Sequence, residues 1–105
     1  MYEPGIRVEA IVSANVLEVK LFGYGVYQGD EIPPLGIIGP FGEMNQFGIR
    51  NPKIQLDSGE VVWGCECWWG PEDKVKTIIG TRTIKLITPS QYRKSSYRKR
   101  GMTND

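Results

Sequence analysis

The sequence contains no histidine, only two cysteines in 105 residues, and no long apolar run. Without histidine, general acid–base catalysis would depend on carboxylates, and the usual cysteine and histidine ligands of a zinc site cannot be supplied by one chain. The apolar stretches are far shorter than the roughly 20 residues that a membrane-spanning helix needs. The N-terminus also lacks the basic and apolar regions of a secretory signal. These absences predict a cytoplasmic protein with no membrane contact, bound metal or cofactor.

The composition is otherwise that of an ordinary globular domain, with 40% hydrophobic and 24% charged residues. The charge is unevenly distributed, because five of the 13 Lys and Arg residues lie within residues 89–105, where Asp105 is the only acidic residue. Nothing in this segment is periodic or apolar, which is typical of a mobile terminus. The sequence therefore predicts one β-barrel domain over residues 1–88 and a basic, flexible C-terminal tail over residues 89–105.

Alternation of apolar and polar residues predicts most of the strands. Residues 6–12 and 17–21 alternate and are separated by a short turn, so they are expected to form a hairpin. A second hairpin is predicted over residues 53–63, where Asp57-Ser58-Gly59 provides the tight turn. Pro71 and the two acidic residues after it favour the start of a short helix, and Gly80 would end it. Residues 83–87 are predicted to form the last strand.

Residues 23–52 hold seven of the 13 glycines and four of the seven prolines, so we expect a long shaped loop there, with at most a short strand near Val26 and Tyr27. The glycines from Gly23 to Gly29 resemble those of a phosphate-binding loop, but their spacing fits neither common fingerprint. Glycines in such a pattern more often allow a strand bulge or a sharp turn.

These elements predict a mostly β fold, a small SH3-like barrel of five to six short strands with a long Gly/Pro-rich loop and one short helical turn; an OB-like barrel is the alternative. Two segments, residues 23–34 (GYGVYQGDEIPP) and residues 62–72 (VWGCECWWGPE), resemble signature stretches of an uncharacterised bacterial and bacteriophage protein family. That family has no assigned activity, so the resemblance implies a bacterial or bacteriophage protein but no biochemical activity.

The segment Trp63-Gly64-Cys65-Glu66-Cys67-Trp68-Trp69 is the most unusual part of the sequence. If it is a strand, its period of two places the cysteines on one face and Glu66 and Trp68 on the other. Free cysteine is commonly buried, and two cysteines this close on a strand form a poor disulfide, so core thiols are expected. Glu66 and Trp68 would then face outward and could hold a flat ring such as a nucleobase or a guanidinium. Alternatively, Trp68 covers a small apolar cluster and Glu66 is solvated.

Two further groups of residues could contribute to binding. Tyr24 and Tyr27 could supply stacking surface opposite Trp68 if the glycine-rich loop folds over the hairpin. The tail combines tyrosines with cations, which suits the stacked bases and phosphates of single-stranded nucleic acid, although such a tail can equally be a solubilising appendage. The predicted phosphate-contacting residues are Arg93, Lys94, Arg98, Lys99 and Arg100.

Taken together, the sequence predicts a non-enzymatic binding module for a nucleotide-like ligand or nucleic acid. No catalytic residue is assigned, because a carboxylate pair would need a deep cleft and Cys65 lacks an evident base. If the resemblance to the phage family holds, such a module could sequester a host signalling nucleotide or block a host factor. The alternative is a protein-interaction or assembly component that uses the same aromatic surface and basic tail to bind a host protein.

Overall fold

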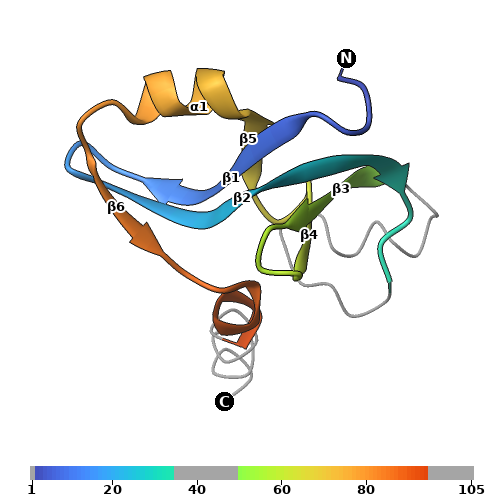
Figure 1. The fold of residues 1–105 in the computed structure, drawn as a ribbon. Helices are drawn as coiled ribbons and strands as arrows, with labels where there is room; N and C mark the ends of the chain where they lie inside the picture. The colour runs from blue at the N-terminus through green and yellow to red at the C-terminus, as the bar shows by residue number, and fades with distance from the viewer. Residues whose placement is uncertain (1, 35–49, 95–105) are drawn as a thin grey trace.

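The computed structural model describes residues 2–34 and 50–94, in which six strands form one mostly antiparallel sheet and two short helices flank it (Figure 1). The strand order is β4-β3-β2-β1-β5, and β6 pairs with β2 outside this path. The elements are β1 (Arg7–Ala14), β2 (Glu18–Glu31), β3 (Asn51–Leu56), β4 (Val61–Trp63), β5 (Trp68–Pro71), α1 (Glu72–Ile79) and β6 (Thr83–Leu86), followed by a second helix at residues 89–94.

The predicted first hairpin is confirmed, with β1 and β2 paired antiparallel. The Oδ1 atom of Asn15 accepts hydrogen bonds from the backbone N–H groups of Leu17 and Glu18, both at 2.8 Å, and so fixes the turn. β2 continues to Glu31, however, so the prediction of a loop from residue 23 is wrong for residues 23–31. A register shift opposite residues 10 and 11 and the positive φ of Gly23 (130°) bend the strand instead of ending it. Residues 35–49 of the predicted loop lie outside the described residues.

The predicted second hairpin and the short helix are also confirmed. Gly59 takes a positive φ of 97° in the turn between β3 and β4, and its N–H donates to the carbonyl of Leu56. α1 begins after Pro71 and ends at Gly80, whose φ is 59°. β6 lies where the last strand was predicted.

The sheet is not closed into a barrel, so the predicted SH3-like or OB-like barrel is not observed. β4 and β5 are the two ends of the strand order. β6 runs parallel to the first half of β2, from Glu18 to Leu21, whereas β3 pairs with its second half, from Gly25 to Glu31. Because β2 is bent, its first half pairs with β6 and its second half with β3 along the same edge. The result is an open, curved sheet.

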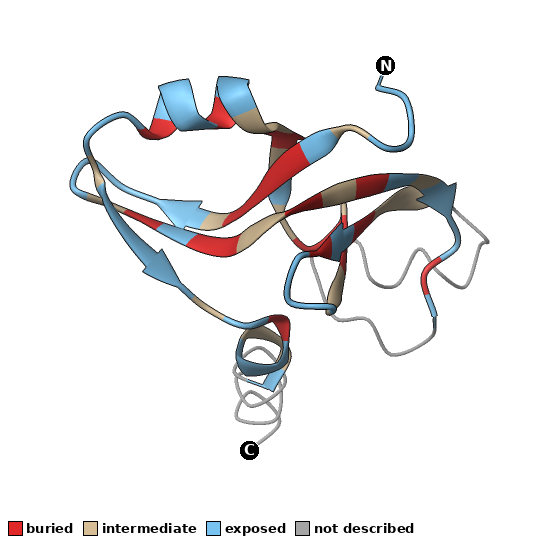
Figure 2. Ribbon diagram, viewed as in Figure 1, coloured by how far each residue is buried: buried red, intermediate tan, exposed pale blue. Residues whose placement is uncertain are grey.

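Two apolar clusters lie on opposite faces of the sheet, because neighbouring strand residues point to opposite sides. Figure 2 shows buried residues along the central strands β1 and β2, whereas β6 is exposed. One face is covered by α1 through Val75 and Ile79, and the other carries the larger cluster, on which Tyr92 packs. The larger cluster consists of Val8, Ala10, Phe22, Tyr27, Ile54, Leu56 and Val62. Within the described ranges, neither helix is long and apolar enough to cross a membrane.

The flexible tail predicted from residue 89 is wrong for residues 89–94, which form a helix against the sheet. The Thr88 side chain accepts from the Gln91 N–H and the Gln91 side chain accepts from the Thr88 N–H, both at 3.0 Å, which is a capping box. The Tyr92 ring meets Phe22 edge-on at a centroid distance of 5.3 Å. Residues 89–94 therefore pack against the predicted domain; residues 95–105 lie outside the described residues, so the flexible tail stays a prediction there.

Glu9 is fully buried in the middle of β1, and within residues 2–34 and 50–94 no hydrogen bond of standard geometry reaches its carboxylate oxygens. Its cross-strand neighbour is Tyr24, and the charges of Lys76 and Glu72 reach it from α1. Burial raises the pKa of the Glu9 carboxyl above its usual range. The hydroxyl of Tyr24 and the positive charge of Lys76 lower this pKa, but by less than burial raises it.

This raised pKa predicts a pH-dependent loss of stability. Between the pKa of the unfolded chain and the higher pKa of the folded protein, the folded state binds more protons, so the free energy of unfolding falls as pH rises. We expect Glu9→Gln to remove this fall and to be the more stable protein at pH 7. Urea unfolding of both proteins between pH 4.5 and 8 would measure it, with exposed Glu3→Gln as the control. Parallel pH profiles for wild type and Glu9→Gln would contradict the prediction.

Candidate functional site

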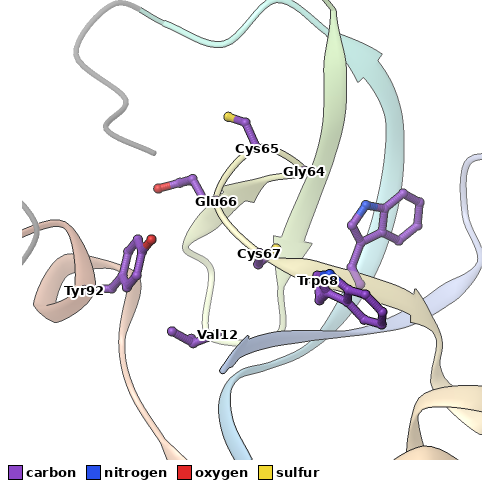
Figure 3. Close-up of a pocket in the computed structure, with 8 residues that line it drawn as sticks. Val12, Gly64, Cys65, Glu66, Cys67, Trp68 and Tyr92 are labelled. Atoms are coloured by element: carbon purple, nitrogen blue, oxygen red, sulfur yellow. The ribbon is translucent and has the colours of Figure 1, made fainter. Parts of the chain in front are cut away.

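A hollow with a volume of about 700 Å³ lies where β5 begins, beside the helix at residues 89–94. The turn at residues 64–67, Val12 of β1, Trp68 and Trp69 of β5, and Tyr92 line it. In Figure 3, the rings of Trp68 and Tyr92 stand on opposite sides, with Cys67 and Val12 between them. The hollow is therefore an open slot with two aromatic walls.

The exposed indole of Trp68 forms one wall, as predicted. Trp68 is 76% exposed and lies opposite Ile11 at the start of β5. Its neighbour Trp69 points to the other face of the sheet, where it stacks on Tyr27 at a centroid distance of 5.0 Å. Strand alternation thus separates the two tryptophans, so that one packs inward and the other remains available to a ligand.

The prediction that Glu66 faces outward is wrong. Its side chain is fully buried and is held by Arg93, whose Nε and Nη2 atoms each donate to the carboxylate at 2.8 Å. The Trp63 N–H donates to the same carboxylate at 3.1 Å. The alternation predicted for residues 63–69 fails because residues 64–67 form a turn, in which the Gly64 N–H donates to the Pro52 carbonyl at 2.8 Å.

Tyr24 and Tyr27 do not line the slot. Tyr27 is buried, and its hydroxyl donates to Asp30 at 2.6 Å, which raises the pKa of that hydroxyl. Tyr24 lies on the opposite face, where Lys76 Nζ stands 5.4 Å from its ring centroid. Of the four predicted ligand-binding residues, Trp68 and Glu66 line the slot, but only Trp68 offers its side chain to a ligand.

The predicted phosphate-contacting residues divide similarly. Arg93 is engaged by the buried Glu66 carboxylate, which raises the pKa of the guanidinium. Lys94 is exposed, two residues after Tyr92, while Arg98, Lys99 and Arg100 lie outside the described residues. Tyr92 falls within the tail that is predicted from the sequence. The capping-box pattern of Thr88 and Gln91 was the signal that could have placed it on a helix.

The two thiols of the turn are not activated. Burial raises the pKa of the Cys67 thiol to about 12, and it also raises that of Cys65. Both thiols therefore stay protonated near neutral pH, whereas a cysteine that acts as a nucleophile or metal ligand must be a thiolate. Within residues 2–34 and 50–94, no three His, Cys, Asp or Glu side chains gather as a metal site.

Comparison with known proteins gives no family for this chain. No family model matches it, and neither the curated proteins nor the solved structures contain a significant match. The resemblance to the phage family stays a prediction.

Proposed function

We propose that the protein is a non-enzymatic binding module that stacks a flat ring, such as a base of single-stranded nucleic acid, on the exposed indole of Trp68 at the edge of the slot. The exposed Trp68 indole carries this proposal, because a large exposed aromatic beside a hollow is a common mark of a binding surface. Stacking on an aromatic ring is available to every base.

Two features favour a nucleic acid as the source of that ring. The helix that supplies Tyr92 also carries Lys94, and Arg98, Lys99 and Arg100 follow it in the sequence. The Glu66 carboxylate beneath the slot is neutralised by Arg93, which reduces its repulsion of a phosphate. A chain that stacks one base in the slot could therefore place neighbouring phosphates near the tail.

The proposal predicts that Trp68→Ala weakens binding of a fluorescent oligothymidylate by roughly 5- to 150-fold, because base stacking on an aromatic is worth about 1–3 kcal/mol. Fluorescence anisotropy at low salt would measure the affinity. Leu86→Ala is the matched control, since Leu86 is a large side chain with a similar exposure of 74% on β6 and does not line the slot. Equal losses in the two variants would contradict a role for the slot.

The same assay at several salt concentrations tests the tail. Deleting residues 95–105 removes Arg98, Lys99 and Arg100, so the slope of log affinity against log salt should fall by about 2. For a free nucleotide, as in the sequestering role, thermal-shift measurements with a panel of mono- and cyclic nucleotides provide the readout.

A protein partner is the second candidate, and the charge balance favours it. The described part contains ten Lys and Arg and ten Asp and Glu, so it has no excess positive charge. The residues outside it hold three cations, at residues 98–100, and two acids, Glu43 and Asp105. Tryptophan is also a frequent anchor of protein interfaces. Binding of a protein partner that Trp68→Ala abolishes and salt barely changes, with no oligonucleotide binding, would select this candidate.

A further inference from the structure

A second cavity, of about 290 Å³, lies on the other side of Trp68, between β1 and the end of α1. Ile11, Val19 and Ile79, all buried members of the apolar cluster under α1, line it. Ile78 and Trp68 are more than half exposed where they border it. The cavity is thus apolar inside and open to solvent at its border.

The lengths of the elements explain why this part of the sheet is uncovered. α1 has eight residues and is about 12 Å long, whereas the eight residues of β1 extend about 27 Å. β5 begins opposite Ile11, so Val12, Ser13 and Ala14 continue beyond it. The sheet therefore extends past both of the elements that cover it.

Among the described residues, Arg82 is the only charged one that lines this cavity. It is half-buried just after the turn at Gly80, and its guanidinium makes no hydrogen bond or ion pair within residues 2–34 and 50–94. By contrast, Arg7 and Arg93 are each held by carboxylates. A guanidinium beside an apolar wall is suited to a carboxylate, which it can bind with two parallel hydrogen bonds.

We propose that this cavity binds a small apolar molecule that carries a carboxylate, such as a medium-chain or aryl acid, with Arg82 as the ion-pair partner. The volume is near the lower end of small-molecule sites, so a compact acid fits better than a whole lipid or a nucleotide. This proposal does not depend on the aromatic slot, because Tyr92 lines only the slot and Arg82 only this cavity.

Titration with sodium octanoate, followed by amide chemical shifts, tests the proposal. We expect saturable shifts at Ala14, Ile79 and Arg82, and weaker binding of the neutral octan-1-ol. Arg82→Gln should weaken octanoate binding roughly tenfold, the usual scale of a charge-assisted hydrogen bond, without changing octanol binding. Lys74→Gln is the matched control, because it removes one charge from exposed α1 surface that does not line the cavity, and it should leave octanoate affinity unchanged.

Two results would overturn the proposal. Equal affinity of octanoate and octanol for the wild-type protein would show that the charge is not recognised, even if Arg82→Gln failed to fold. Saturable octanoate binding that persisted in Ala14→Trp, which fills the cavity entrance, would place the site elsewhere. Tyr92→Ala should impair oligonucleotide binding alone, so failure of the slot and failure of this cavity are distinguishable.

Discussion

Replacing Arg93 with alanine should lower the free energy of unfolding by about 3 kcal/mol, because it leaves the buried Glu66 carboxylate without its cation. The Glu66 side chain is fully buried, whereas that of Arg93 is 30% exposed. Without Arg93, water can solvate the Glu66 carboxylate only if the structure rearranges locally. This loss is at the low end of the range for removing one partner of a buried ion pair, because solvent reaches part of the Arg93 guanidinium. Urea unfolding would measure the loss.

Lys94→Ala is the control for this experiment, because Lys94 follows directly on the same helix and is exposed. Its free energy of unfolding should stay within about 0.5 kcal/mol of wild type. Amide exchange at residues 89–94 adds a second measurement, since loss of the ion pair should release this helix and speed exchange there. If Arg93→Ala were as stable as Lys94→Ala, the ion pair would not hold the helix to the sheet.

Gly25→Ala should cost about 3 kcal/mol or prevent folding, because the added methyl has no space between β2 and β3. A Cβ at this position would lie 2.8 Å from the Leu56 Cα and closer still to the Gln55 carbonyl oxygen. Both are backbone atoms, so relief requires the strands to separate.

Gly70→Ala is the comparison, because its Cβ would lie 3.4 Å from a methyl of Val75, an ordinary contact with a side chain. We expect it to cost less than about 1 kcal/mol. Thermal and urea unfolding of the two variants would measure the difference. A Gly25→Ala protein as stable as Gly70→Ala would contradict the close approach of β2 and β3.

Elements specified by neighbouring residues could be predicted from the sequence. The Asp57-Ser58-Gly59 turn and the Pro71 and Gly80 boundaries of α1 depend on local backbone preferences. The extent of β2 could not be predicted, since glycine at position 23 is compatible with both a loop and a bulge, and only pairing with β1 and β3 decides between them.

The candidate site was predicted in part for the same reason. Exposure of Trp68 was correctly expected from strand alternation, although the segment is a turn followed by a strand. The position of Glu66 depends on that turn. The turn is held by the contact of Gly64 with Pro52 and by the ion pair of Glu66 with Arg93, and neither Pro52 nor Arg93 is close to the turn in the sequence. The same long-range ion pair, together with the contact between Tyr92 and Phe22, holds a helix where a mobile tail was expected.

The parallel pairing of β6 with β2 has a consequence for how the chain is made. The first half of β2 finds its second neighbour only in residues 83–86, close to the end of the described chain. During synthesis on the ribosome, the hairpin of β1 and β2 therefore forms before β6 is available, and the backbone edge of the first half of β2 stays unpaired until then. That edge can pair with another strand until residues 83–86 occupy it.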